Sequence, residues 1–230
     1  MSNTHLLDHS LSQTTLISAI YPVGPAAIIV MPMIVGGLID SYGFSEQQAG
    51  AVASAEGVGL VLGLLMAALW VRTVRWRSSL FVGLAGYALL NFGSSMAEGH
   101  TQIMALRFLS GYIGGCVFAI VVAALGDNRE PDRAFGIGQA VQGLLMGLLF
   151  MLAPLLMSIF GVNGVFYMMA ALALLAILFC LDFLSRVLFR SPLPMAMAVV
   201  KLRSRLWLYC TSASLGGLFT IWQFLDFGGS

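Results

Sequence analysis

The sequence predicts an all-α membrane protein of about seven transmembrane helices, and two observations predict it: its composition and the length of its apolar runs. Hydrophobic residues make up 59% of the 230 residues, and charged residues only 9%. A soluble domain is about half apolar and about one quarter charged, so this chain has too few charged groups to cover a water-facing surface. We therefore expect lipid to surround most of the chain.

Seven apolar runs are each long enough to cross a bilayer as a helix, which takes about 20 residues. In chain order they cover residues 16–39, 48–70, 80–97, 103–125, 135–160, 164–183 and 206–227. Because backbone N–H and C=O groups in lipid must bond within the protein, each run must be a helix or a barrel strand. A barrel strand needs only about ten residues of alternating polarity, so runs of this length predict helices.

The positive charges gather on one side of the predicted bundle. Of the 11 Lys and Arg residues, ten lie in the loops after the second, fourth and sixth runs, and the loops on the opposite side hold none. Cytoplasmic loops of membrane proteins are enriched in Lys and Arg. We therefore expect the N-terminus and the loops at 72–77, 127–133 and 186–205 to be cytoplasmic.

Glycine, present 26 times, recurs at a spacing of four residues in two of the runs. Gly59 and Gly63 in the second run resemble Gly143 and Gly147 in the fifth run. Small residues four apart let helix backbones approach closely. We expect the second and fifth helices to cross at these glycines, and the likeness of the two runs also fits a bundle built from two repeats of three helices.

Other features argue against several classes of function. The net charge is +1, so no overall field attracts nucleic acid. The three cysteines lie in apolar stretches without a CxxC spacing, and the three histidines lie in loops without nearby metal ligands. Because no Ser-His-Asp set, phosphate-binding loop or zinc spacing is visible, we expect no enzyme activity, no cofactor and no metal site.

Three segments carry the motifs of a known family. Residues 67–77 match the Leu and the arginines of a G-x-L-a-D-R-x-G-R-[RK] motif, although Val71 stands where the motif has Asp. Residues 107–115 read Arg-Phe-Leu-Ser-Gly-Tyr-Ile-Gly-Gly, like an R-x-x-x-G-x-x-x-[GA] pattern, and residues 127–136 contain an acidic-Pro-Arg-Gly connection. In these segments and in its charge topology, the chain resembles the major facilitator superfamily of transporters over about residues 18–183.

The resemblance implies one half of a twelve-helix protein that is built from two six-helix halves, and so a truncated chain with a missing C-terminal half as its partner. We expect a cytoplasmic tail at 1–15, a six-helix bundle at 16–184, a cytoplasmic linker at 185–205 and a seventh helix at 206–230. The resemblance also implies cytoplasmic gating loops. Their candidate residues are Arg72, Arg75, Arg77, Asp127 and Arg133.

Two ionisable residues inside the runs, Glu56 and Arg107, are candidates for function because a charge in lipid is costly. At about 1.5 Å per helical residue, Glu56 lies about 12 Å deep and Arg107 about 6 Å deep, so their side chains can meet if their helices are neighbours. We expect Glu56 to face the interior and take up a proton, with Arg107 as its partner. The alternatives are a neutral, hydrogen-bonded Glu56 and an Arg107 that extends to the membrane surface.

Polar and helix-breaking residues extend this predicted substrate and proton pathway. Two prolines and a glycine at residues 21–25 loosen the first run and free backbone carbonyls. A kink that faces substrate at Tyr21 is one interpretation, and a tolerated transmembrane proline is the other. Gln142 in the fifth run either faces the same cavity or bonds another helix.

The leading hypothesis is a secondary active transporter of a small solute, driven by a proton or another ion. We expect a multi-pass protein of a bacterial plasma (inner) membrane, with membrane lipid and a small-molecule substrate as partners. The alternatives are a seven-helix receptor and a non-transporting structural or assembly protein. A retinal receptor needs a Lys inside its last helix, whereas Lys201 lies in the predicted linker, and a ligand receptor usually has its N-terminus outside the cell.

Overall fold

The computed structural model describes residues 17–186, apart from residues 98 and 129, and these are helical except for short connections. The helices are α2 (Val23–Tyr42), α3 (Glu46–Trp70), α4 (Trp76–Ser94), α5 (His100–Gly126), α6 (Pro131–Phe160) and α7 (Asn163–Arg186). Residues 17–20 are also helical and precede α2 across a turn. Each of the first six predicted runs therefore corresponds to a helix. The predicted tail and seventh helix, and the predicted linker beyond residue 186, lie outside the described residues.

The helices have the length and polarity of a membrane protein. Among the described residues, four spans are long and apolar enough to cross a bilayer, and α7 has a shorter apolar part at Asn163–Phe179. The four spans are Ile17–Tyr42, α3, α5 and α6. α4 is more polar, and its second half carries Asn91 and Ser94, whose side chains are fully buried. These two polar groups therefore face other helices rather than lipid. The described residues form an all-α membrane bundle, and this prediction is confirmed.

The residues at the helix ends explain where the helices begin and end. Ser45 caps α3: its Oγ accepts a hydrogen bond from the backbone N–H of Gln48 at 3.2 Å, and the Gln48 side chain accepts one from the Ser45 N–H at 3.0 Å. These bonds satisfy two amide groups that have no partner within the helix. Gly43 ends α2 with a φ of 67°, a conformation that glycine adopts without steric cost. Pro131 begins α6, where its missing N–H costs no helical bond.

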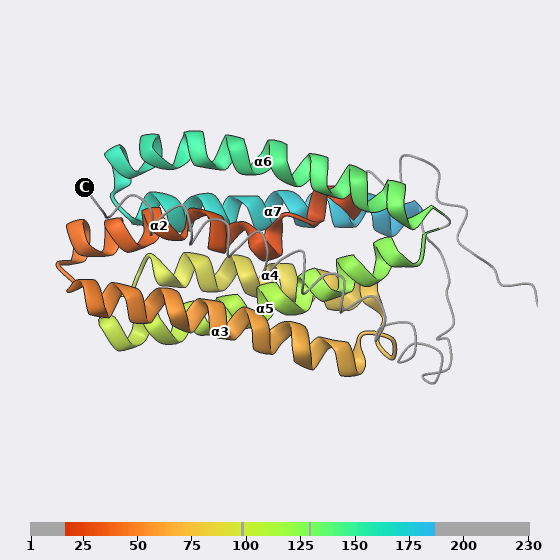
Figure 1. The fold of residues 1–230 in the computed structure, drawn as a ribbon, viewed down its shortest axis with the longest axis horizontal. Coiled ribbons are helices and arrows are strands. Elements are labelled where there is room, and N and C mark those ends of the chain that lie inside the picture. The colour runs from red at the N-terminus through yellow and green to blue at the C-terminus, as the bar shows by residue number, and fades with distance from the viewer. Residues whose placement is uncertain (1–16, 98, 129, 187–230) are drawn as a thin grey trace, which may run out of the picture. The chain divides into compact units, whose positions relative to one another are not determined.

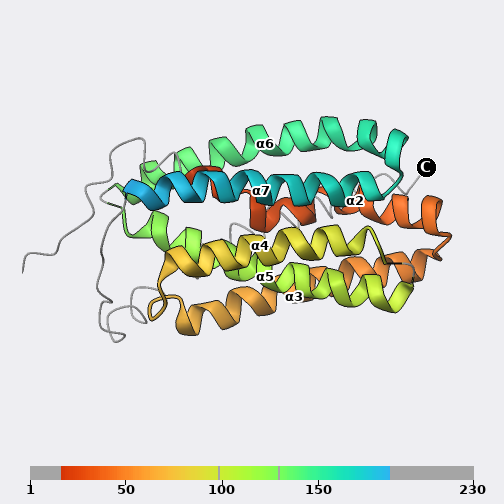
Figure 2. The same cartoon turned by 180° about the vertical axis from the view of Figure 1, so that it is seen from behind.

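Figures 1 and 2 show the six helices lying side by side along one common direction. α5 contacts α2, α3, α4 and α6, α2 contacts α3, α5, α6 and α7, and α7 also contacts α4 and α6. α3 and α6 lie on opposite sides of the bundle in both views. Large apolar side chains such as Leu69 of α3 and Leu144 of α6 are exposed on the outside. An apolar exterior of this kind suits a bundle that is surrounded by lipid.

A seam of four glycines joins α3 to α5. A Cβ atom at Gly59 would strike the backbone oxygen of Phe108, and one at Gly63 would strike that of Tyr112. From the other side, a Cβ atom at Gly111 or Gly115 would strike a backbone oxygen of α3. The two backbones are therefore in direct contact, as small residues four apart permit.

The predicted crossing of the second and fifth helices is wrong. Gly59 and Gly63 do pack against another helix, but that helix is α5 rather than α6. A Cβ atom at Gly143 or Gly147 would meet nothing within 4 Å, and α6 lies across the bundle from α3 (Figures 1 and 2). The physical reason is that small-residue spacing shows where a helix can be approached, but it does not identify the helix that approaches.

Candidate functional site

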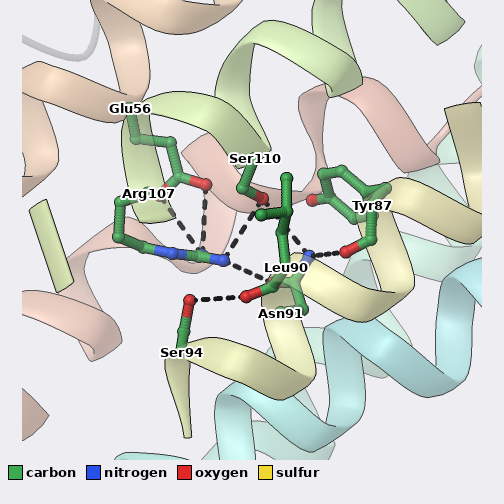
Figure 3. A network of polar contacts seen from close by, with 7 residues as sticks. All are labelled: Glu56, Tyr87, Leu90, Asn91, Ser94, Arg107 and Ser110. Carbon is green, nitrogen blue, oxygen red and sulfur yellow. Dashed lines mark hydrogen bonds and ion pairs between the residues drawn. The ribbon is translucent and has the colours of Figure 1, made fainter. Parts of the chain in front are cut away.

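A fully buried polar network links α3, α4 and α5 inside the bundle (Figure 3). Its members are Glu56 of α3, Asn91 of α4, and Arg107 and Ser110 of α5, and none is more than 1% exposed. Glu56 lies about 15 Å along α3 and Arg107 about 10 Å along α5, counted from the first residue of each helix. The glycine seam begins within one turn of both residues, so it holds the two helices close enough for their side chains to meet.

The guanidinium group of Arg107 binds four neighbours. Its Nη1 donates to Oε1 of Glu56 at 3.2 Å and lies 3.5 Å from Oε2, so one nitrogen serves both carboxylate oxygens. Its Nη2 donates to Oδ1 of Asn91 at 2.7 Å and to Oγ of Ser110 at 3.2 Å. The ring of Phe166 on α7 lies 5.0 Å from its Cζ, within the range of a cation–π contact. The predicted contact between Glu56 and Arg107 is thus present in the structure.

Asn91 is a member of the network that the sequence reasoning missed. Its Nδ2 donates to the backbone oxygen of Tyr87 at 2.8 Å and to Oγ of Ser110 at 3.3 Å, while its Oδ1 accepts from Arg107. Ser94, one turn further along α4, instead bonds the backbone oxygen of Leu90 in its own helix. A signal for Asn91 existed, because an amide inside an apolar run needs a buried partner just as Glu56 does.

A second polar cluster surrounds the break in the first span. Tyr21 and Pro22 form a turn between residues 17–20 and α2, because Pro22 has no N–H to donate. The Tyr21 hydroxyl accepts a hydrogen bond from Nε2 of Gln139 on α6 at 3.4 Å. Oε1 of Gln142, one turn further along α6, is buried and has no hydrogen-bond partner among the described residues. The first span is therefore interrupted at Tyr21 and Pro22, which fits both interpretations of this segment, and Gln139 is a further member of the cluster that was not predicted.

The two clusters lie at different depths of the bundle. The Tyr21 ring packs at a tilt against Phe118 of α5, with ring centroids 5.0 Å apart. Phe118 follows Arg107 by eleven residues, which is about 16 Å along the helix. The structure therefore joins Glu56 to Arg107 but places Tyr21 at another depth.

An ion pair links the ends of α3 and α5 at the loops that were predicted to be cytoplasmic. Nη1 of Arg72 lies 2.7 Å from Oδ2 of Asp127, and both side chains are about one fifth exposed. The Arg72 guanidinium also lies 5.8 Å from the centre of the Trp76 ring. Arg133 pairs with Glu130 at 3.2 Å, but both of these side chains are largely exposed, so water screens the pair. Arg75 is the residue before α4, and its side chain is exposed.

An open groove of about 450 Å³ runs between α2 and α6. Its walls are mostly apolar and include Met33, Asp40 and Ser41 from α2 and Met157 and Ser158 from α6. None of the predicted pathway residues lines it. The polar chemistry of the described bundle therefore lies in the two buried clusters rather than in this groove.

The model of the Major Facilitator Superfamily matches residues 10–228, which is nearly the whole chain. No curated protein matches the chain.

Proposed function

We propose, from the premise that the chain belongs to the major facilitator superfamily, that it moves a small solute by secondary active transport coupled to protons. The family indicates a membrane transporter. The proton coupling and the choice of a small solute are the proposal. The observation that carries it is the buried ion pair of Glu56 and Arg107.

The ion pair can exist in two states that differ by one proton. Burial disfavours the charged carboxylate, and the neighbouring cation favours it. A conformation that changes the contact between the two groups would therefore change the affinity of Glu56 for a proton. Uptake and release in different conformations is what coupling to a proton gradient requires, because a ligand shifts a conformational equilibrium only through its different affinity for the two states.

We further propose that the N-terminus and the loops at 72–77 and 127–133 face the cytoplasm of a bacterial cell. The separation of ten positive charges from the opposite loops supports this orientation. It places Glu56 and Arg107 in the outer part of the membrane and Tyr21 in the inner part. We also propose that residues 16–184 act as the first half of a transporter that needs a second six-helix half.

The test measures proton movement after reconstitution of the complete transporter, both halves included, into vesicles. A pH-sensitive dye is trapped inside, a panel of small solutes is added, and labelled solute is followed in parallel. We expect Glu56→Gln to abolish solute-dependent proton movement while exchange of labelled solute continues, because Gln keeps the shape but cannot titrate. Glu130→Gln is the matched control, since Glu130 also pairs with an Arg at 3.2 Å but lies exposed in a loop. Proton movement that persists in Glu56→Gln would contradict the coupling role.

A further inference from the structure

We propose that Asn91 is a positioning residue, which holds Nη2 of Arg107 away from a two-nitrogen pair with Glu56 and thereby sets the pH at which Glu56 takes up its proton. The inference rests on the proposed function, because it requires that Glu56 titrates. It concerns a residue on a third helix, α4, that does not itself carry charge.

The contact distances show which partner holds Arg107 most closely. The shortest hydrogen bond of its guanidinium is the one to Asn91 Oδ1, at 2.7 Å, whereas both contacts to the Glu56 carboxylate are 3.2 Å or longer. Only Nη1 faces the carboxylate, so the ion pair is not the parallel, two-nitrogen arrangement that Arg and carboxylates form when free to do so. Asn91 occupies the Nη2 group that such an arrangement would use.

Asn91 is itself held in place. Its Nδ2 is bonded to the Tyr87 backbone oxygen and to Ser110 Oγ, and its side chain has no exposed surface. The other contacts of Arg107, with Ser110 and the Phe166 ring, are also neutral. When Glu56 takes up a proton, Arg107 therefore loses one charged partner but keeps three neutral ones. It stays where it is, and its charge continues to act on Glu56.

The effect of replacing Asn91 then depends on the charge of the new side chain. Leu removes the closer of the two acceptors of Nη2 and leaves Ser110 Oγ, so Nη2 can turn toward Glu56, which stabilises the carboxylate and lowers the pH at which it is protonated. Asp retains the acceptor but adds a negative charge that offsets Arg107 and repels the Glu56 carboxylate, which raises that pH. The Leu variant therefore tests the positioning role, and the Asp variant tests whether the site responds to a charge at this position.

Among the described residues, no charged group other than Arg107 is found to contact Glu56 in this part of the bundle. Glu56 faces Arg107 from α5, and the buried Tyr87 of α4 lies close enough to interact with it electrostatically. The packed part of α2, residues 23–39, contains no charged residue. Tyr167 of α7 is directed toward the rings of Phe92 and Phe160. The charged residues of these two helices lie near their C-terminal ends: the exposed Asp40 on α2, and Asp182 and Arg186 on α7.

The experiment is an infrared titration of the whole chain in lipid nanodiscs, which needs no substrate. The carbonyl band of protonated Glu56 is identified as the band that disappears in Glu56→Gln, and its midpoint pH is measured in Asn91→Leu, Asn91→Asp and Ser94→Ala. We expect the midpoint to fall by about one pH unit or more in the Leu variant, to rise by as much in the Asp variant, and to stay unchanged in Ser94→Ala. Ser94 is the matched control because it is buried one turn away on α4 and bonds only its own helix in the described structure.

The outcomes separate this inference from the proposed function. A Glu56 band that titrates in the native chain but has the same midpoint in all Asn91 variants overturns the positioning role and leaves proton coupling intact. Shifts of the same sign in the Leu and Asp variants also overturn it. A native chain without a titrating Glu56 band between about pH 4 and pH 10 overturns both. If Asn91→Leu does not fold, Asn91→Ala replaces it and carries the same expectation.

Discussion

Gly111→Ala would place a methyl group against the backbone oxygen of Glu56, at the point where α5 and α3 touch. The obstructing atom belongs to the main chain of a neighbouring helix, so it cannot turn aside as a flexible side chain would. The two helices must separate locally, and the residues on either side of the seam lose their close contact. The same separation would lengthen the distance between Glu56 and Arg107, which lies one turn before Gly111.

The size of the effect follows from two opposing contributions. Forcing an extra methyl group into a close-packed contact costs about 1–3 kcal/mol. Replacing Gly by Ala inside a helix stabilises it by about 1 kcal/mol, because Ala loses less conformational entropy. At Gly143, where a Cβ atom meets nothing within 4 Å, only the second contribution applies. We therefore expect Gly111→Ala to destabilise the chain by up to about 2 kcal/mol, and Gly143→Ala to stabilise it by up to about 1 kcal/mol.

The assay is unfolding of the purified chain in mixed micelles of mild detergent and dodecyl sulfate, followed by tryptophan fluorescence. The midpoint of unfolding should move down for Gly111→Ala and up, or not at all, for Gly143→Ala. The two variants have the same chemistry and differ only in the space beside the glycine. Equal shifts, or a larger loss for Gly143→Ala, would refute the assignment of the seam to α3 and α5.

Three further predictions follow from the ion pairs and the loops. Arg107→Met leaves the Glu56 carboxyl buried without its cation, so we expect a loss of about 3–5 kcal/mol in the same unfolding assay, and a double variant with Glu56→Gln should recover most of it. A double variant no more stable than Arg107→Met would contradict a direct interaction. Arg72→Ala breaks a partly exposed pair with Asp127, so its cost should be at most about 1 kcal/mol and should shrink in high salt. A larger cost that salt leaves unchanged would contradict that estimate. Asn128→Cys, in the loop between α5 and α6, should react with a membrane-impermeant thiol reagent only in broken cells, and labelling of intact cells would reverse the proposed orientation.

The helices and one contact of the site could be predicted from the sequence alone. Run lengths predicted seven helices because the thickness of lipid imposes a length on every span, and the first six runs are helices in the described part of the chain. The meeting of Glu56 and Arg107 could be predicted because a buried charge needs a partner, and the two residues had similar estimated depths. The depth of a residue in the membrane can be estimated by counting residues along its helix. Which helices are neighbours in the bundle cannot be read from the sequence in this way.

The same limit explains what was missed. Gly59 and Gly63 were predicted to pack against Gly143 and Gly147. On α5, Gly111 and Gly115 are also four residues apart, and these are the glycines that face α3. Asn91 and Gln139 were not singled out, because an uncharged amide in an apolar run is a weaker signal than a charge. Tyr21 was grouped with Glu56 on polarity alone, and the length of α5 between Arg107 and Phe118 separates the two.

α3 and α5 are joined at three levels, which bears on how a proton at Glu56 can act. The Glu56–Arg107 pair joins them near one end, the glycine seam follows, and the Arg72–Asp127 pair joins them at the other end. The acid lies on α3 in the first pair and on α5 in the second. Sliding one helix by a turn, about 5.4 Å, would break both pairs and press side chains into the seam. A proton taken up by Glu56 therefore changes the charge within a pair of helices that is held along its length, beside an Arg107 that also contacts Asn91 of α4 and Phe166 of α7.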